Sequence, residues 1–238
     1  MSAFALPVET TRPMEARLAE ALPADDGWRY EPKWDGFRCL AFKAGKAVEL
    51  RAKSGKSLSR YFPDVVERVR AMRTKAFVID GELIIVADGA LSFEALQLRL
   101  HPAASRVAKL AAAQPAQLLA FDCLAVGARS LLQAPLTERR QALEELLGGG
   151  APGVRLSPYA RDAQTAGAWL KRSGRALDGV IAKRADGPYL QGERAMLKVK
   201  RLRTADCVVG GFRYASAGGL VGSPEPEKMN GFEAFRLV

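Results

Sequence analysis

YEPKWDGFRCL, residues 30–40, sets one lysine among aromatic residues, a proline and a glycine. Asp35 follows Lys33 by two positions, and Arg38 follows it by five. A free lysine amine is mostly protonated at neutral pH, so it attacks poorly unless burial or a neighbouring cation lowers its pKa. Lys33 is therefore either a nucleophile or a partly exposed lysine on an ordinary strand, and this segment alone favours the strand.

Short apolar or alternating runs, bounded by Gly, Asp or Lys, surround this segment and predict strands. The expected strands cover residues 28–33, 37–43, 47–52, 77–87, 117–126, 178–184 and 195–201. The expected helices cover residues 14–21, 63–72, 92–100, 137–147 and 164–173. Strands outnumber helices and arrive in runs, which predicts an α+β fold of largely antiparallel sheets flanked by helices.

The sequence pattern changes after Lys200, where a new strand-like run is followed by a polar segment without a clear apolar periodicity. We therefore expect one domain over residues 1–202 and the start of a second over residues 203–238. The second segment is too short to build an independent core by itself.

The composition is basic, with 36 Lys and Arg against 26 Asp and Glu and a formal net charge of +10. Such an excess favours a polyanionic partner, nucleic acid first, although solubility alone is the other explanation. No apolar run is long enough to span a bilayer, and the N-terminus shows no signal-peptide pattern.

The cysteine and histidine content narrows the chemistry. Cys39, Cys123 and Cys207 lie far apart, which argues against a disulfide framework or a structural zinc site and fits a reducing cytosol. His101 is the only histidine, so a serine–histidine hydrolase or a multi-histidine metal site would have to be built around it.

Two carboxylates alternate with apolar residues in VIDGELIIV, residues 78–86. Asp80 and Glu82 should share one face of a strand, and an unpaired buried charge is costly. A divalent cation, a ribose hydroxyl or a structural salt bridge would serve as the partner, and the salt bridge is favoured by this segment alone.

Two further segments carry charge on expected strands. LDGVIAKR, residues 177–184, begins with Asp178 and carries Lys183 further along. In RAMLKVKRLR, residues 194–203, Lys198 and Lys200 share one face, and two lysines repel unless an anion lies between them. A phosphate would supply that anion, and a solvated strand face is the alternative.

LLAFDCLAV, residues 118–126, is an apolar strand that carries Phe121. This ring is placed either to stack on a base or to fill the core.

Taken in order, these segments resemble the motifs of the covalent nucleotidyltransferases, whose KxDGxR signature matches Lys33–Arg38. The further motifs are matched by Asp80–Glu82, Phe121–Asp122, Asp178–Lys183 and Lys198–Lys200. The intervening SFEALQLRL and PLTERRQALEEL resemble ATP-dependent DNA ligases, in particular the bacterial end-joining type (LigC and LigD). The resemblance runs from about residue 5 to about residue 220 and implies an ATP-grasp-like nucleotidyltransferase domain followed by an OB-fold domain, which is expected to be truncated here.

In such ligases the lysine attacks the α-phosphate of ATP, passes AMP to the 5′-phosphate of a nick, and the 3′-hydroxyl then displaces AMP. The resemblance implies Lys33 as the nucleophile. It implies nucleotide binding by Glu31, Arg38, Glu82, Phe121, Lys183, Lys198 and Lys200, metal binding by Glu82 and Asp178, and DNA contact by Lys53 and Arg194.

The same resemblance implies ATP and Mg²⁺ or Mn²⁺ as cofactors, nicked double-stranded DNA and a Ku-like end-joining protein as partners, and a role in DNA repair or recombination in the bacterial cytosol and nucleoid. If the OB-fold domain is absent, self-adenylation is expected to be weak, and sealing of pre-adenylylated nicks is expected to suffer less.

Two other functions stay open. An RNA ligase or a capping-type guanylyltransferase would share the chemistry of Lys33, although the ligase-like segments at 92–100 and 137–147 argue against both. A non-catalytic or weakly active DNA-binding remnant of a ligase is the alternative from another class.

Overall fold

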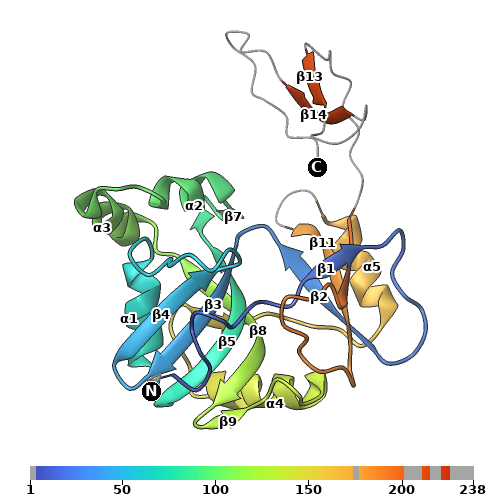
Figure 1. Cartoon of the computed structure of the whole chain (residues 1–238), viewed down its shortest axis with the longest axis horizontal. Helices are drawn as coiled ribbons and strands as arrows, with labels where there is room; N and C mark the ends of the chain where they lie inside the picture. Colours follow the sequence, from blue (N-terminus) through green and yellow to red (C-terminus); the bar gives the residue numbers. More distant parts are fainter. Residues whose placement is uncertain (1–3, 174–176, 201–210, 215–220, 226–238) are drawn as a thin grey trace. The chain divides into compact units, whose positions relative to one another are not determined.

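The computed structural model describes residues 4–173, 177–200, 211–214 and 221–225 (Figure 1). The chain divides into two compact units, residues 1–201 and 202–238. In the second unit, β13 (Gly211–Tyr214) pairs antiparallel with β14 (Val221–Glu225). The rest of residues 203–238 lies outside the described ranges, so the expected start of an OB-fold domain stays a prediction.

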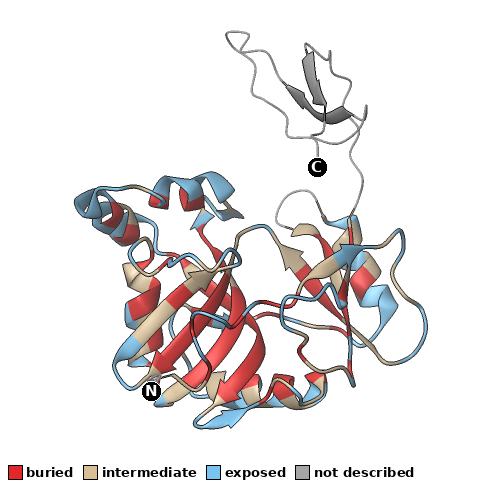
Figure 2. Ribbon diagram, viewed as in Figure 1, coloured by how far each residue is buried: buried red, intermediate tan, exposed pale blue. Residues whose placement is uncertain are grey.

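The larger sheet of the first unit is mostly antiparallel and has the strand order β10-β8-β5-β3-β4, with β9 paired to β8. Its strands are β3 (Phe37–Ala44), β4 (Ala47–Ala52), β5 (Ala76–Ile84), β8 (Gln117–Val126), β9 (Arg129–Ser130) and β10 (Val154–Leu156). Only β10 joins in parallel, against β8. The central strands of this sheet carry many of the buried residues in Figure 2.

The smaller sheet has the order β1-β12-β11-β2. Its strands are β1 (Ala16–Leu18), β2 (Trp28–Trp34), β11 (Leu177–Arg184) and β12 (Met196–Val199). A two-stranded hairpin of β6 (Val86–Ala87) and β7 (Ala90–Leu91) follows β5. Antiparallel pairing dominates both larger sheets, and the prediction of an α+β fold is confirmed.

Five helices lie among the described residues: α1 (Pro63–Ala71), α2 (Phe93–Arg99), α3 (Ala104–Ala113), α4 (Leu136–Leu147) and α5 (Ala163–Lys171). Helix α1 begins at a proline, whose missing N–H costs nothing at that position. Its valines 65, 66 and 69 are buried against the larger sheet. In α2, Ser92 caps the N-terminus as expected, because its hydroxyl accepts from the Ala95 N–H.

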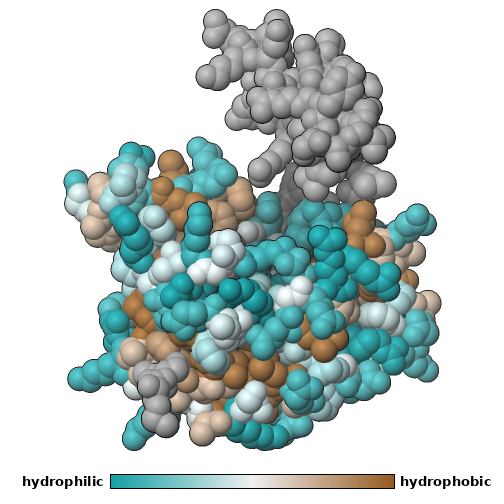
Figure 3. Space-filling model, viewed as in Figure 1, coloured by the Kyte–Doolittle hydropathy of each residue, from teal (hydrophilic) through white to brown (hydrophobic). Residues whose placement is uncertain are grey.

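Three groups of apolar side chains hold these layers together. The largest group joins α1, α4 and one side of the larger sheet, and a second joins that sheet to the N-terminal segment through Leu6, Val8 and Met14. The third places Ala166 of α5 against Val180 and neighbouring residues of the smaller sheet. Hydrophilic residues cover most of the face in Figure 3, and apolar ones gather over α2, where Leu98 is exposed.

The expectation of a helix over residues 14–21 is wrong, because residues 16–18 form strand β1. This strand runs parallel to β12, and the Ala19 N–H donates to the Lys198 carbonyl oxygen 2.9 Å away. A partner about 180 positions later in the chain overrides the local helical pattern, as tertiary context often does. The expected strand over 77–87 also ends earlier, at Ile84, before the β6–β7 hairpin.

Arg139 joins helix α4 to the larger sheet through a buried, two-pronged ion pair with Asp122 of β8. Arg139 Nε lies 2.7 Å from Asp122 Oδ1, and Nη2 lies 3.1 Å from Oδ2. Its Nη1 donates to the carbonyl oxygens of Ala134 and Gly187. Both charged side chains are 1% exposed, so neither can exchange its partner for water.

Replacing Arg139 with Met should lower the free energy of unfolding by about 3–5 kcal/mol, because it leaves a buried carboxylate without its partner. Urea denaturation of the full chain measures this change. Arg129→Met is the matched control, since the Arg129–Glu138 pair is 69% and 40% exposed and should contribute less than about 1 kcal/mol. Equal losses in the two variants would contradict this view of α4.

Candidate active site

A cavity of about 490 Å³ is lined by strands from both sheets of the first unit. Ten of the eleven residues singled out from the sequence line it: Glu31, Lys33, Arg38, Lys53, Glu82, Phe121, Lys183, Arg194, Lys198 and Lys200. The eleventh, Asp178, contacts Lys33 and Lys200 directly. The fold therefore brings together residues that are spread over 170 positions of the sequence.

The opening segment is the point at which the chain crosses from one sheet to the other. Lys33 lies near the end of β2 in the smaller sheet, and Arg38 lies at the start of β3 in the larger one (Figure 1). Gly36 makes this crossing possible, because a β-carbon there would lie 2.2 Å from the carbonyl oxygen of Leu83. Lys33 and Arg38 thus reach the same cavity from different sheets.

The Lys33 amine is held by the carboxylate of Asp178. Nζ of Lys33 lies 2.5 Å from Asp178 Oδ2, and Nζ of Lys200 lies 2.8 Å from the same oxygen. Burial acts to raise the pKa of Asp178, but the hydrogen bonds from Lys200 and Lys33 outweigh it and hold that pKa below its ordinary value. The carboxylate thus supplies negative charge between two lysines that would otherwise repel.

Gly179 explains how Asp178 reaches this position. The pairing of β11 with β2 shifts register between Leu177 and Gly179, and Gly179 has a φ of +141°. A β-carbon at Gly179 would lie 2.2 Å from the carbonyl oxygen of Val199. Only glycine allows β12 to approach this closely beside Asp178.

Asp80 holds Arg38 from the buried side of the cavity. Arg38 Nε and Nη2 each lie 2.6 Å from one oxygen of the Asp80 carboxylate, which is fully buried. The Tyr189 hydroxyl donates to the same carboxylate at 2.5 Å. The sequence allowed a cation, a ribose hydroxyl or a salt bridge as the partner of this carboxylate, and the structure shows a salt bridge with Arg38.

Glu82 differs from Asp80 although both lie on β5, because Glu82 lines the cavity. Burial raises the pKa of Glu82 to about 7, and the nearby Arg38 and Lys33 act in the opposite direction without cancelling it. Among the described residues, no group of three or more His, Cys, Asp or Glu side chains is placed to hold a metal ion. Glu82 and Asp178 could therefore bind a cation only if further ligands, from outside these side chains, completed its coordination.

A buried ion pair and an aromatic ring form another wall of the cavity. Lys183 Nζ lies 2.7 Å from Glu31 Oε2 and 4.0 Å from Asp122 Oδ2. Burial raises the pKa of Glu31, opposed by the charge of Lys183. The Phe121 ring has the Lys183 ammonium 4.6 Å and the Arg38 guanidinium carbon 4.5 Å from its centroid. The ring is 7% exposed, so stacking of a base on it stays a prediction.

Cations gather at the remaining side of the cavity. Burial and the neighbouring charges of Lys200, Lys33, Lys53 and Arg194 lower the pKa of Lys198. Lys53 Nζ lies 2.9 Å from Glu15 Oε2, and both groups are partly exposed. A polyanion would find here more positive charge than the local carboxylates neutralise.

Sequence reasoning missed several residues that line the cavity. Met14, Glu15 and Arg17 enter it beside β1, where a helix was expected. Ile181 also lines it, and its place on β11 between Val180 and Ala182 made it look like core. The alternation of β11, with Ile181 and Lys183 two positions apart, is the signal that could have found it.

Comparison with known proteins places these features in context. A family model described as an ATP dependent DNA ligase domain matches residues 11–200. DNA ligase C2 of Mycolicibacterium smegmatis is 47% identical over 207 residues, which cover 87% of this chain and 58% of the relative. DNA ligase C of Mycobacterium tuberculosis is 46% identical over 211 residues, with the same coverage of 87% and 58%. The chain thus spans less than two thirds of the length of these curated relatives.

Solved structures show the same fold. A mycobacterial DNA ligase D complexed with ATP and MES has a TM-score of 0.67 at 27% identity, covering 92% of this chain and 68% of that one. The ligase domain of LigD from M. tuberculosis has a TM-score of 0.65 at 26% identity, covering 82% of this chain and 62% of that one.

The raised pKa of Glu82 predicts a specific pH dependence of stability in metal-free buffer. Between its ordinary pKa of 4.5 and about 7, folded Glu82 keeps a proton that the unfolded chain has lost. Stability should therefore fall as pH rises through this window and level off above it. The wild type should lose roughly 1–3 kcal/mol relative to Glu82→Gln between these pH values, measured by urea denaturation.

Glu94→Gln is the matched control, because Glu94 is exposed on α2 and its variant should follow the wild-type curve. If Glu82→Gln also follows the wild-type curve, Glu82 does not titrate as its burial requires.

Proposed function

The chain belongs to the family of ATP-dependent DNA ligase domains, and we propose that it catalyses the nucleotidyl transfers that join a nicked DNA strand. The observation that carries this proposal is the position of Lys33 in a cavity with Lys198 and Lys200, where its amine is paired with Asp178. At this position Lys33 lies near carboxylates that could bind a cation and near ammonium groups that could neutralise phosphate oxygens. Phosphoryl transfer depends mainly on such positioning and charge neutralisation.

In the first reaction, the Lys33 amine attacks the α-phosphate of ATP. A bond forms between Nζ and the α-phosphorus, the bond from that phosphorus to the bridging oxygen breaks, and pyrophosphate leaves. Lys33 must react as the neutral amine, so its ion pair with Asp178 at 2.5 Å has to open first. Lys198 and Lys200, which also line the cavity, neutralise charge on the α-phosphate.

Glu82 and Asp178 are the carboxylates that would hold Mg²⁺ or Mn²⁺. These donors fit such an ion, because Mg²⁺ is commonly bound through one or two carboxylates plus substrate phosphates rather than by an all-protein cage. When bound, the ion supplies neutralisation of phosphate charge. Asp178 already holds the ammonium groups of Lys33 and Lys200 through one oxygen, so a cation held there would replace positive charge that these lysines now supply.

The nucleotide base would lie against the wall formed by Glu31, Phe121 and Lys183. Glu31 reads adenine, Phe121 stacks on it, and Lys183 fixes the position of Glu31 through their 2.7 Å ion pair. Arg38, clamped by Asp80, holds a ribose hydroxyl or the nick phosphate. The relative solved with ATP supports this choice of nucleotide, since its fold covers 92% of this chain.

In the second and third reactions, AMP passes from Lys33 to the 5′-phosphate of the nick, and the 3′-hydroxyl then displaces AMP as the new phosphodiester forms. Lys53 and Arg194 contact the DNA backbone at the open side of the cavity. The formal charge of +10 supports nicked duplex DNA as the substrate, and binding should weaken with salt.

We infer a role in DNA repair or recombination in the bacterial cytosol and nucleoid, with a Ku-like end-joining protein as a partner. None of the described helices has the length and apolar character needed to cross a membrane.

Lys33→Ala should abolish joining of an ordinary nick with ATP yet keep joining of a nick that already carries AMP on its 5′-phosphate. The reason is that Lys33 is needed only to load AMP, whereas the final displacement uses the remaining cavity. The measurement is gel separation of a labelled nicked duplex with full chain, ATP and Mg²⁺, and GTP replaces ATP in a parallel arm.

Lys109→Ala is the control, because Lys109 is exposed on α3 and should leave both reactions unchanged. Joining of the ordinary nick by Lys33→Ala would contradict the proposed function. Covalent GMP on Lys33 of the wild type, formed with GTP and not with ATP, would favour a capping-type enzyme. DNA binding by the wild type with no nucleotide adduct and no joining of either nick would favour a non-catalytic remnant.

A further inference from the structure

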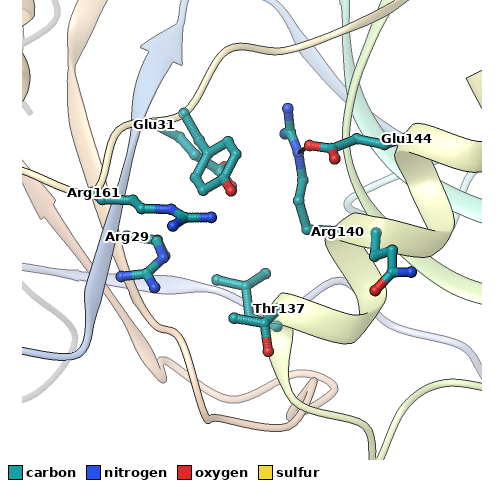
Figure 4. A pocket seen from close by; sticks show the side chains of 9 residues that line it. Arg29, Glu31, Thr137, Arg140, Glu144 and Arg161 are labelled. Carbon is teal, nitrogen blue, oxygen red and sulfur yellow. Dashed lines mark hydrogen bonds and ion pairs between the residues drawn. The ribbon is translucent and has the colours of Figure 1, made fainter. Parts of the chain in front are cut away.

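A second cavity, of about 300 Å³, shares Glu31 with the nucleotide cavity but is otherwise lined by different residues (Figure 4). Arg29 comes from β2, Arg140 from α4, and Arg161 from the segment just before α5. None of these three arginines was singled out from the sequence. In Figure 4, Arg161 extends toward helix α4, which carries Arg140, whereas the Arg29 guanidinium lies below Arg161 and turns back toward its own strand.

The carboxylates of this cavity are already neutralised. Glu31 is paired with Lys183 at 2.7 Å, and Glu144 is paired with Arg140 Nε at 2.8 Å. Arg29 donates to the carbonyl oxygen of Trp28, and no carboxylate in the part of the chain that the structure describes pairs with it. The wall therefore carries more positive charge than its own acids balance.

Arg161 adds to this excess. Its side chain is exposed and hydrogen-bonds the Tyr159 side chain; the charge of Glu144 acts on it, but no carboxylate within the described ranges forms an ion pair with it. Two guanidinium groups that form no ion pair thus line a cavity in which both acids are already paired. Arginine forks match the oxygens of phosphate groups in spacing and charge.

Arg140 supplies the observation that points to a ligand. The residue is 5% exposed, and its Nη1 is buried with no hydrogen-bond partner among the described residues. Its guanidinium carbon lies 4.6 Å from the centroid of the Tyr159 ring, and Glu144 holds its Nε. The group is thus held in place while one buried donor stays unpaired, which costs about 1–3 kcal/mol or more unless an acceptor satisfies it.

We propose that this second cavity binds a phosphate-type anion, at a site separate from the nucleotide cavity. The donors would come from Arg29, Arg140 and Arg161, which line the cavity together with Thr137. Its volume lies near the lower end for small-molecule sites, which suits inorganic phosphate, pyrophosphate or one phosphate of a larger molecule. The shared Glu31 places this anion directly beside the residue expected to read the base.

The test measures protection of Arg29 and Arg161 from phenylglyoxal, which modifies accessible arginines, by peptide mass spectrometry on the full chain. Inorganic phosphate, pyrophosphate and a nicked DNA duplex are titrated separately, with chloride at equal ionic strength as the reference. Saturating phosphate or pyrophosphate should slow modification of both arginines about tenfold relative to chloride. Exposed Arg106 of α3 is the internal control and should be modified at an unchanged rate.

Four variants show which cavity the protection depends on. Arg161→Gln should remove protection of Arg29, and Arg140→Gln should weaken it, because the three groups share one anion. Arg106→Gln removes the same charge elsewhere and should leave protection unchanged. Lys198→Ala should weaken anion binding in the nucleotide cavity and leave the protection of Arg29 and Arg161 unchanged. This result would separate the two sites.

Protection by DNA alone would support the site and identify the phosphate as that of the nucleic-acid backbone. Protection by no anion beyond the level of chloride, or protection of Arg29 that survives Arg161→Gln, would overturn the proposal. The proposal does not rest on strand joining, because the readout is arginine modification and is the same for an inactive chain.

Discussion

The buried row of alternating charges Glu31, Lys183, Asp122 and Arg139 is the constraint on which the arrangement of this protein depends. The four residues come from β2, β11, β8 and α4, so the row ties both sheets and a helix to one another. A buried ion is expensive by itself and becomes tolerable only beside its partner. Moving any of these elements would separate opposite charges in a medium that screens them poorly, and the cavity beside Lys183 therefore has a fixed wall.

The way the two sheets are joined also determines the position of the reactive lysine, through the backbone. The Lys33–Arg38 segment crosses from one sheet to the other, so the position of Lys33 relative to Arg38 depends on how the sheets are joined. Asp80 fixes Arg38 from the buried side, and Asp178 fixes Lys33 from the exposed side. In the Arg38–Asp80 contact the carboxylate is fully buried and the arginine is 22% exposed, whereas the Lys33–Asp178 pair is 26% and 33% exposed and can open more easily. This difference suits an arginine that holds its position and a lysine that reacts.

Much of the strand layout was predictable because β2, β3, β4, β8 and β11 are bounded by local turn residues and carry clear apolar patterns. The helix expected over residues 14–21 was wrong because the pairing of β1 with β12 is invisible to any local window. Helix α3 was missed although a signal existed, since Val107 and Ala111 lie four positions apart in an alanine-rich run and both are buried.

The cavity residues were predictable only as an ordered set of motifs. The partners that orient them were not, since Tyr189 reaches Asp80 across 109 positions. In the second cavity, Arg29 and Arg161 belong to no motif, and Arg140 lies in the ligase-like segment without a role assigned to it.

The central claim is that Lys33 forms a covalent bond to AMP, and mapping that bond tests it most directly. The full chain is incubated with ATP labelled at the α-phosphate and Mg²⁺, digested without acid, and analysed by peptide mass spectrometry. The account predicts one AMP per chain, attached to Lys33 in the peptide that carries EPKWDGFR and lost on acid treatment as a phosphoramidate. An adduct on Lys53, Lys183, Lys198 or Lys200, with Lys33 unmodified, would contradict it.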